Sequence, residues 1–306
     1  MVEKEKKIWL EGELVDWDEA KVHVLAHTLH YGLGAFEGIR AYRRENGKTA
    51  IFRLREHVQR LYDTCKLIAV NPRFTFEQVC KASVDVVRAN KLSEAYVRPL
   101  VFIGPGAMGV YAPDNPILTT VMAWRWGAYL GAGALEKGVR TKISAWIRHH
   151  PSIALAKGKI MGQYTNSVLA KREARIAGYD EAILMDIQGN ICEGSGENLF
   201  IVKKGKLITP PLNASILAGI TRDTVITLAR EESLVVEERH ITRDQLYLAD
   251  EAFFTGTAVE VTPVREVDDR AVGDGAVGPI TRRLQERYFD VVKGKDETHP
   301  EWLTYV

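Results

Sequence analysis

The segment from Lys157 to Phe200 contains the side chains that are best suited to chemistry. Two lysines, Lys157 and Lys159, stand among glycines, and Tyr164 follows them. A buried lysine can act as a nucleophile, because desolvation lowers the pKa of its amine. Further along, Glu193 opens the polar run Glu-Gly-Ser-Gly-Glu-Asn. A carboxylate of this kind can keep the nitrogen of a pyridine ring protonated, which makes the ring withdraw electrons.

Two turns of small residues could bind the phosphate group of such a ring cofactor. The run from Leu217 to Asp223 leads directly into an expected helix, whose first N–H groups could bind an anion. Gly256-Thr257-Ala258 forms a second such turn after an expected strand. Each pattern is common by itself, so the residues alone leave a pyridoxal site as one of several interpretations.

Motifs of other catalytic and binding classes do not occur. The sequence has no GxxxxGK[ST], which a P-loop nucleotide site needs, and no GxSxG, which marks the nucleophile of α/β hydrolases. His23, His27 and His30 are spaced four and three residues apart, as ligands on one helix face would be. No acidic residue accompanies them at the usual spacing, so ordinary core or surface histidines are favoured and no metal site is expected.

Composition and charge narrow the class of protein. The chain has 306 residues, of which 46% are hydrophobic and 26% charged, and this suits a globular protein of two domains. Its net charge of +1 provides no electrostatic basis for binding nucleic acid or membrane. The first residues are charged where a signal peptide would be apolar. Cys65, Cys80 and Cys192 form no CxxC pair, as expected for free thiols, so we expect a cytoplasmic protein.

The elements that must position these groups follow from periodicity. Residues 8–15 predict a β-hairpin, and strands are expected at 49–52, 96–103 and 117–124. Apolar residues at helical steps from Val58 to Ile68 predict a helix. Thr75 and Gln78 form a capping-box pattern that should start another helix, which runs to Asn90.

A Gly- and Ala-rich stretch at 126–137 is predicted as an interdomain linker between domains at 1–125 and 138–306. Strands outnumber crossover helices, so the predicted fold is α+β rather than a doubly wound sheet. Beyond the linker we expect strands at 139–145, 181–186, 198–202, 206–209, 251–254 and 259–267, with helices at 163–177, 221–232 and 280–292.

Six ordered blocks resemble the branched-chain amino-acid aminotransferases, which are pyridoxal-phosphate-dependent class IV aminotransferases. The blocks begin at Tyr31 (YGLGAFEGIRAY), Tyr96 (YVRP), Trp126 (WGAY), Glu193 (EGSGENLF), Leu217 (LAGITRD) and Gly256 (GTAVEVTPV). The match extends from about Trp9 to Phe289, nearly the whole chain. The resemblance implies fold type IV, the D-amino-acid-aminotransferase-like fold. In that fold a smaller N-terminal and a larger C-terminal α/β domain bind pyridoxal 5'-phosphate at their boundary.

By this resemblance, Lys159 forms the Schiff base with the cofactor and later moves the Cα proton of the substrate. The family places its lysine five residues before a tyrosine, here Tyr164, which selects Lys159 over Lys157. Lys157 is then expected to be a flanking loop charge. Tyr164 is expected to hydrogen-bond the ring hydroxyl, and Glu193 to pair with the ring nitrogen.

The resemblance assigns the rest of the cofactor site to groups that bind the phosphate or shape the ring pocket. Backbone N–H groups of Ile220 and Thr221 are expected to bind the phosphate, together with Arg60 and Thr257. Without the resemblance, Arg60 would be interpreted as an ordinary surface arginine. The full set is Arg60, Leu217, Gly219, Ile220, Thr221, Gly256 and Thr257.

The implied substrate pocket combines aromatic rings with polar groups for the carboxylates. Arg98 is expected to receive the distal carboxylate of glutamate or 2-oxoglutarate, so that one pocket accepts both kinds of substrate. Any single aromatic residue, Trp126 above all, could instead serve the core. The implied set is Tyr31, Phe36, Arg40, Tyr96, Arg98, Trp126, Tyr129, Thr257 and Ala258.

The resemblance therefore implies ping-pong transfer of an amino group from L-leucine, L-isoleucine or L-valine to 2-oxoglutarate. It also implies a homo-oligomer, either a dimer or a hexamer built of dimers. A D-amino-acid aminotransferase or an aminodeoxychorismate lyase would keep Lys159 and Glu193 but change the substrate wall. A catalytically idle binding protein is the alternative from another class. Two departures from the family pattern, Ile160-Met161 and Val259, could shift the side-chain preference.

Overall fold

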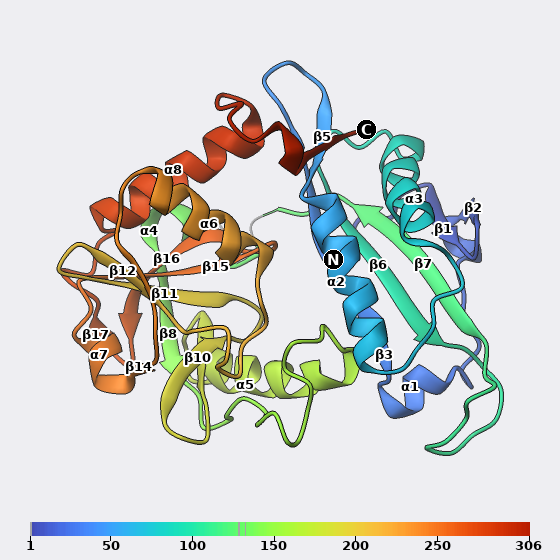
Figure 1. Cartoon of the computed structure of the whole chain (residues 1–306), viewed down its shortest axis with the longest axis horizontal. Coiled ribbons are helices and arrows are strands. Elements are labelled where there is room, and N and C mark those ends of the chain that lie inside the picture. The colour runs from blue at the N-terminus through green and yellow to red at the C-terminus, as the bar shows by residue number, and fades with distance from the viewer. Residues whose placement is uncertain (1, 128, 132) are drawn as a thin grey trace. The chain divides into compact units, whose positions relative to one another are not determined.

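The computed structural model describes residues 2–127, 129–131 and 133–306. By their internal contacts these residues form two compact units, drawn as a cartoon in Figure 1. The first unit comprises Met1–Gly127, Gly158–Tyr164 and Val291–Val306, and the second comprises Ala128–Lys157 and Thr165–Asp290. After residue 127 the chain thus returns to the first unit twice. The prediction of a single linker at 126–137 did not include these two returns.

The first unit is built on an antiparallel sheet with the strand order β18-β5-β4-β6-β7-β1-β2, in which β3 also pairs with β6. The predicted hairpin at 8–15 is confirmed as the pair β1–β2, and the three predicted strands are confirmed as β5, β6 and β7. The strands are β1 (Lys7–Leu10), β2 (Glu13–Asp16), β3 (Gly34–Phe36), β4 (Ile39–Arg43), β5 (Thr49–Phe52), β6 (Ala95–Ile103), β7 (Ile117–Trp124) and β18 (Leu303–Tyr305).

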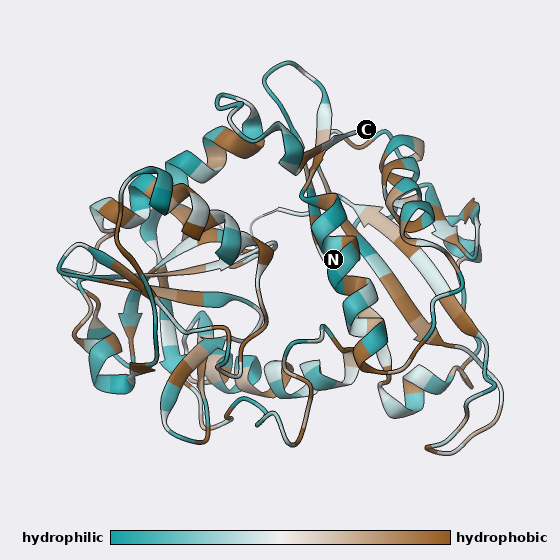
Figure 2. Ribbon diagram, in the orientation of Figure 1, coloured by the Kyte–Doolittle hydropathy of each residue, from teal (hydrophilic) through white to brown (hydrophobic). Residues whose placement is uncertain are grey.

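Two amphipathic helices pack on this sheet, α2 (Leu54–Leu67) and α3 (Phe76–Ala89). Hydrophobic and hydrophilic residues alternate along both ribbons in Figure 2, and Leu61 and Val86 on their apolar faces are fully buried in the core. The predicted capping box is confirmed: the Thr75 hydroxyl accepts from the N–H of Gln78, and the Gln78 side chain accepts from the N–H of Thr75. Shorter pieces are η1 (Trp17–Glu19), α1 (His27–Tyr31), η2 (Met161–Gln163) and η3 (Pro300–Trp302).

The second unit contains a mixed sheet with the strand order β13-β12-β11-β15-β16-β8-β9-β10-β14, with β17 beside β16. A further pairing of β10 with β11 closes six of these strands, β8 to β11 with β15 and β16, into a ring. The strands are β8 (Val139–Ile143), β9 (Glu181–Met185), β10 (Asn190–Gly194), β11 (Asn198–Lys203), β12 (Lys206–Thr209), β13 (Val236–Glu238), β14 (Ile241–Thr242), β15 (Glu251–Gly256), β16 (Glu260–Val267) and β17 (Arg270–Ala271).

The ring is filled by apolar side chains and covered by helices. Ile183, Leu199 and Phe254, from three of the six strands, belong to one buried apolar cluster. The rings of Phe200 and Phe253, which stack with centroids 5.0 Å apart, lie on the opposite face of β11 and β15. The helices of the second half of the chain are α4 (Ala134–Lys137), α5 (Tyr164–Ile176), α6 (Ile220–Glu231), α7 (Arg243–Tyr247) and α8 (Pro279–Lys293). This mixture of helices with antiparallel and parallel strands confirms the predicted α+β class. Within the described residues, no helix combines the length and apolar character needed to cross a bilayer.

Two local expectations differ from the structure. Within the predicted linker, α4 forms at its end, and Leu130 and Ala134 pack against the core of the second unit, so this part is not a free connector. Ala128 and Ala132 of the predicted linker lie outside the described residues. Strand β10 was not predicted, because its five residues Asn-Ile-Cys-Glu-Gly are too few and too polar to show a strand period.

The amide of Asn90 ties β1 to the end of α3. Its Oδ1 accepts from the N–H groups of Lys6 and Lys7, and its Nδ2 donates to the carbonyls of Lys7 and Val86. We expect Asn90→Ala to lower the free energy of unfolding by about 2 kcal/mol, because it leaves partly buried backbone groups without partners. Urea unfolding followed by circular dichroism measures the change. The control Gln59→Ala on the exposed face of α2 should stay close to the parent, and an equal loss in both variants would contradict this role for Asn90.

Candidate active site

The side chain of Lys159 meets that of Tyr164 within the first unit. Nζ of Lys159 lies 2.7 Å from Oη of Tyr164. The same Nζ lies 4.8 Å from the centroid of the Phe36 ring, which meets the Tyr164 ring edge-on at 4.7 Å between centroids. An amine, a phenol and an apolar wall are thus brought together from two distant parts of the sequence.

Backbone contacts fix the position of this lysine. Its N–H donates to Oγ1 of Thr64 at 3.0 Å, and its carbonyl accepts from the N–H of Phe36 at 3.2 Å. Next to it, Ala35 and Ile160 form an antiparallel bridge. The segment that carries Lys159 therefore lies along β3 as a short added strand.

Two glycines allow this segment to lie so close. The N–H of Gly162 donates to the carbonyl of Gly32 at 2.9 Å. Gly32 has φ of +73°, and a Cβ there would lie 2.8 Å from Cα of Gly162. The atoms it would meet belong to the backbone, which cannot move aside as a flexible side chain could, so a side chain at Gly32 would displace the lysine segment.

Arg60 is bound to a buried carboxylate and is not a surface arginine. Its Nε and Nη2 donate to the two oxygens of Glu37 at 2.7 and 2.9 Å, and Nδ1 of His57 lies 2.7 Å from Oε2. Burial alone would raise the pKa of Glu37, but the charge of Arg60 and the contact with His57 outweigh it and hold that pKa well below its ordinary value. Burial lowers the pKa of His57, so its imidazole is neutral. The buried charges of Arg60 and Glu37 therefore compensate each other.

Aromatic rings surround the guanidinium of Arg98. Its Nη2 donates to Oη of Tyr96 at 3.1 Å, and its Cζ lies 4.9 Å from the centroid of the Phe36 ring. Its Nε is buried without a hydrogen-bond partner among the described residues. Trp126 meets Tyr96 edge-on at 4.2 Å between centroids. Rings and a cation with unused donor capacity suit a site that accepts both apolar and anionic side chains.

The remaining predicted residues of the first unit are placed differently. Arg40 lies opposite Tyr96 in the β4–β6 register. Tyr31 lies on α1, where its ring packs on His27 and its hydroxyl accepts from the N–H of Gly109 at 3.1 Å. These contacts do not join Tyr31 to the rings around Arg98.

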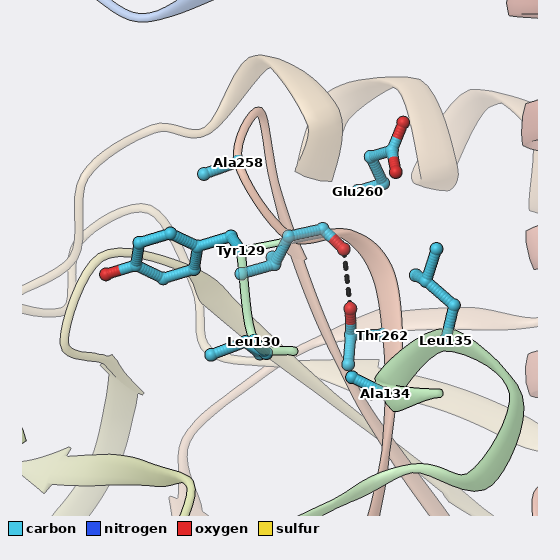
Figure 3. A pocket seen from close by; sticks show the side chains of 8 residues that line it. Tyr129, Leu130, Ala134, Leu135, Ala258, Glu260 and Thr262 are labelled. Carbon is cyan, nitrogen blue, oxygen red and sulfur yellow. Dashed lines mark hydrogen bonds between the residues drawn. The ribbon is translucent and has the colours of Figure 1, made fainter. Parts of the chain in front are cut away.

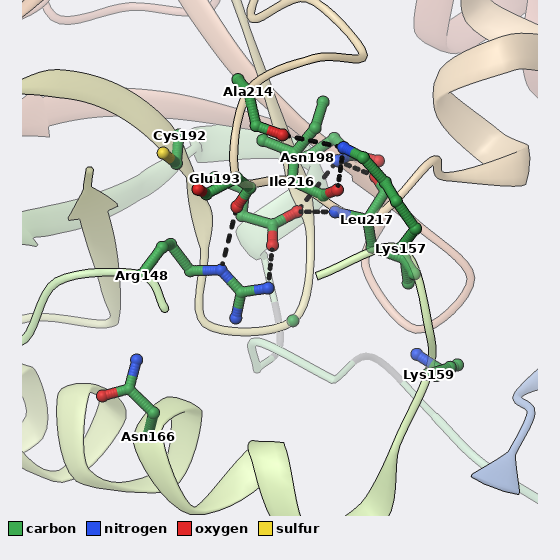
Figure 4. A network of polar contacts seen from close by, with 12 residues as sticks. Arg148, Lys157, Lys159, Asn166, Cys192, Glu193, Asn198, Ala214, Ile216 and Leu217 are labelled. Atoms are coloured by element: carbon green, nitrogen blue, oxygen red, sulfur yellow. Dashed lines mark hydrogen bonds and ion pairs between the residues drawn. The ribbon is translucent and has the colours of Figure 1, made fainter. Parts of the chain in front are cut away.

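Glu193 is a buried carboxylate with three protein donors, in the second unit (Figure 4). Its Oε1 lies 2.8 Å from Nη2 of Arg148, and its Oε2 accepts from Nδ2 of Asn198 and from the N–H of Leu217, both at 3.1 Å. Glu193 and Asn198 are also the residue pair that joins β10 to β11. A register shift beside Glu193 makes Cys192 a bulge, which re-aims the neighbouring side chain.

Lys157 has specific contacts that its flanking position did not predict. The residue is exposed, but its Nζ donates to the carbonyls of Ala214 and Ile216 at 2.7 and 2.9 Å. Burial of the ammonium group lowers the pKa of Lys157, and the charge of Glu193 opposes that effect. The lysine predicted to be a flanking loop charge is therefore attached to the loop that precedes Leu217.

The start of α6 presents backbone N–H groups, the kind of group that can bind an anion. Gly219 is its N-cap, and the buried Ile220 and Thr221 provide N–H groups of the first turn. A Cβ on Gly219 would lie 1.9 Å from Oδ1 of Asn198, so only glycine admits the amide that also contacts Glu193. The helix start and the carboxylate are thus joined through Asn198.

Tyr129 and Ala258 line one small cavity of about 10 Å³ in the second unit (Figure 3). Ala258 follows Gly256 and Thr257 at the end of β15, and Oγ1 of Thr262 donates to the carbonyl of Val259 at 2.5 Å behind it. Glu260, which completes this turn, has a left-handed φ of +57°. Such strain is common where a backbone is shaped for a ligand.

Sequence reasoning missed several side chains that shape the site. Glu37 and Asn198 stand inside the blocks that carry the resemblance, but no local pattern marks them as partners of Arg60 and Glu193. Arg148 gave no signal, because a buried arginine and a surface arginine look alike in a sequence.

A second pair of buried acids supports the hairpin that carries Glu193. Glu197 and Glu181 are both buried, and their carboxyl groups are close enough to interact electrostatically. Glu181 also accepts from Nζ of Lys171, and Glu197 accepts from the N–H of Gly196. Burial, followed by the charge of Glu181, raises the pKa of Glu197 well above its ordinary value. Burial therefore favours the neutral form of the Glu197 carboxyl group.

Known proteins with the same architecture match the whole chain. The model of the family "Amino-transferase class IV" matches residues 34–267. A branched-chain-amino-acid aminotransferase of Pseudomonas aeruginosa is 48% identical, over 100% of this chain and 99% of that protein. The crystal structure of the Escherichia coli branched-chain amino acid aminotransferase is 46% identical, with a TM-score of 0.96 over 98% of this chain and 99% of that chain. A branched-chain amino acid aminotransferase from T.th., complexed with N-(5'-phosphopyridoxyl)-L-glutamate, is 46% identical, with a TM-score of 0.94 over 99% of each chain.

The lowered pKa of Glu37 predicts a specific dependence of stability on pH. The folded state binds the Glu37 proton more weakly than the unfolded state, so the ion pair stabilises the fold above the ordinary pKa of 4.5 and less as the pH falls below it. We expect Glu37→Gln to unfold at lower urea concentration than the parent at pH 7, with a gap that narrows towards about pH 3.5. A gap that stays constant over this range would contradict the assignment.

The raised pKa of Glu197 predicts a stability contribution that changes with pH in the opposite direction to that of Glu37. The folded state binds this proton more tightly than the unfolded state, so Glu197 costs stability as the pH rises above 4.5. Glu197→Gln keeps a hydrogen-bond donor without a proton to lose. Its stability relative to the parent should therefore increase between about pH 5 and pH 8 in urea unfolding.

The matched variant Glu181→Gln separates the two acids. It removes the carboxylate that Lys171 contacts and should destabilise the protein at every pH in that range. If Glu197→Gln lost as much stability as Glu181→Gln at about pH 8, that result would contradict the raised pKa of Glu197.

Proposed function

The chain belongs to the class IV aminotransferase family, and from this premise we propose that it transfers the amino group of L-leucine, L-isoleucine or L-valine to 2-oxoglutarate with pyridoxal 5'-phosphate as cofactor. The observation that carries the proposal is the contact between Lys159 and Tyr164. An amine that lies 2.7 Å from a phenol, beside an apolar ring, is suited to nucleophilic attack and proton transfer.

The residues present fit this cofactor in the kinds of groups they offer. The ring nitrogen needs a carboxylate, and Glu193 is buried, with three donors that favour its charged form. The phosphate needs N–H groups and a cation, and the start of α6, Thr257 and the partly buried Arg60 are suited to it. When bound, pyridoxal phosphate supplies a ring that withdraws electrons from the substrate Cα.

Lys159 carries out the proton transfers in this proposal. Its Nζ takes the proton from the substrate Cα and returns a proton later, which is the part of a general base and acid. Tyr164 orients that amine through its hydroxyl. Glu193 keeps a proton on the ring nitrogen, because a carboxylate favours the charged form of a nearby base. Leu217 lies next to Glu193 through its N–H, where its side chain can pack on the ring.

Substrate choice is proposed to depend on the rings around Arg98. Phe36, Tyr96 and Trp126, with Tyr129, offer apolar surface to a branched side chain. Arg98 offers its guanidinium to the distal carboxylate of 2-oxoglutarate, and its Nε, which has no partner among the described residues, supports such a role. The backbone N–H groups of Thr257 and Ala258 are proposed to bind the α-carboxylate. In support, the relatives that match over the full chain are named for branched-chain amino acids, and one is complexed with a glutamate adduct.

A D-amino-acid aminotransferase or an aminodeoxychorismate lyase of the same family is the remaining alternative. Both would use Lys159 and Glu193 and would differ in substrate. Assembly as a homo-oligomer and a cytoplasmic location are further proposals, which come from the family resemblance and from composition.

The proposal predicts a spectral change on adding one amino acid. Purified protein reconstituted with pyridoxal phosphate should show a visible absorption band that L-leucine converts to that of the pyridoxamine form, and 2-oxoglutarate should restore it. Lys159→Ala should slow this half-reaction by about 10²–10⁴-fold, the usual contribution of a general base. Lys66→Ala, an exposed lysine on α2, is the matched control and should react as the parent does.

The outcomes separate the alternatives. A band that D-alanine converts and L-leucine leaves unchanged would replace the proposed substrate with a D-amino acid. Pyruvate release from aminodeoxychorismate without transamination would identify the lyase. Failure to bind pyridoxal phosphate at all would overturn the cofactor and the reaction together.

A further inference from the structure

Three successive carbonyl groups accept hydrogen bonds from two cationic side chains in the second unit. The carbonyls of Ala214 and Ile216 accept from Nζ of Lys157, and the carbonyl of Ser215 between them accepts from Nε of Arg148 at 3.2 Å. The next residue, Leu217, donates its N–H to Glu193. Figure 4 shows Lys157 reaching this loop from one side and Arg148 from the other.

Arg148 contacts both the loop and the carboxylate. Its Nε binds Ser215, while its Nη2 lies 2.8 Å from Oε1 of Glu193. The planar guanidinium fixes the angle between these two bonds, which a lysine could not do. The residue is buried, and its own N–H donates to the carbonyl of Met185 on β9, the strand next to β10. The base of the arginine is therefore anchored on the same sheet as Glu193.

Apolar packing supports the same loop. Ala214 and Ile216 are buried against Cys192, the bulged residue beside Glu193. The loop thus meets β10 through its side chains, meets Arg148 and Lys157 through its carbonyls, and meets Glu193 through the N–H of Leu217. These polar contacts hold either the Glu193 carboxylate or the loop that leads to Leu217.

We propose that Arg148 is a positioning residue for the transamination reaction, which sets the orientation of the Glu193 carboxylate and of Leu217, with Lys157 as its partner on the loop. The inference rests on the proposed function, because it assigns Glu193 to the ring nitrogen of the cofactor. Arg148 acts through Glu193, because it contacts one oxygen of that carboxylate itself, and the loop that it binds leads to the Leu217 N–H, which contacts the other oxygen. Removing the arginine takes this cation away from a buried carboxylate and leaves the loop without one of its donors.

A double-substitution cycle tests this coupling. The set is Arg148→Met, Glu193→Gln and both together, with Arg55→Met in the exposed Arg55–Glu77 pair as the control. Arg148→Met should weaken pyridoxal phosphate binding, measured by equilibrium dialysis, by about 10- to 100-fold, the range common for groups that orient a ligand-binding side chain. The L-leucine half-reaction should slow by a similar factor with little change in KM. In the Glu193→Gln background, Arg148→Met should weaken cofactor binding by a clearly smaller factor, because only its contact with the Ser215 carbonyl remains to be lost.

Two other outcomes would overturn either the role of Arg148 or the proposed function. Equal losses from Arg148→Met in both backgrounds would show that the arginine does not act through Glu193 and would overturn the proposal. If the parent binds pyridoxal phosphate but reacts with no amino acid, the proposed function fails, while the binding cycle still decides the role of Arg148.

Two further variants guard against loss of folding. Arg148→Lys keeps the charge but cannot make both bonds in the same geometry, so binding should weaken by an intermediate factor. Lys157→Met removes only the contacts to Ala214 and Ile216, and it should weaken cofactor binding while circular dichroism stays unchanged. Cofactor affinity equal to that of the parent in both variants would contradict the proposal, whatever the fate of Arg148→Met.

Discussion

One residue pair, Glu193 opposite Asn198, closes the ring of six strands in the second unit. A ring of strands leaves no unpaired edge, but it needs its last two strands to meet, and here they meet at a single pair. The Asn198 amide links this closure to the loop before α6, because it donates both to Glu193 and to the carbonyl of Leu217. Strand closure, the loop before α6 and the orientation of a buried acid therefore depend on the same few atoms.

Buried charge is treated differently in the two units. Glu37 is compensated by a full cation, Arg60, in a bidentate contact, which keeps both groups ionised at the cost of desolvating them. Glu197 has no bidentate cation among the described residues, and burial raises its pKa, which favours the neutral form of the carboxyl group. In the first arrangement both groups stay charged and their charges compensate each other. The second is neutral at Glu197 and serves the hairpin next to it.

Much of the fold followed from local sequence, and much of the site did not. The capping residues Thr75 and Gln78 predicted where α3 begins, because capping depends on neighbours three residues apart. Strand β10 was missed, since its burial comes from distant strands and not from its own five residues. Lys159, Tyr164 and Glu193 were selected by resemblance and spacing. Arg148 could not have been selected, because its contact with Ser215 spans 67 positions of the chain and leaves no local pattern.

The pairing of β18 with β5 bears on how the protein is made. Thr304 lies opposite Ile51, and the N–H of Arg53 donates to the carbonyl of Trp302 at 2.6 Å. When the first half of the chain has been synthesised, β18, the strand that pairs with the open edge of β5, has not yet been made. Until it has been made, the N–H and C=O groups on that edge are open to other chains. Contacts so far apart in sequence also form slowly. The nascent protein thus passes through a stage in which aggregation competes with folding, and a chaperone that shields β5 would act at that stage.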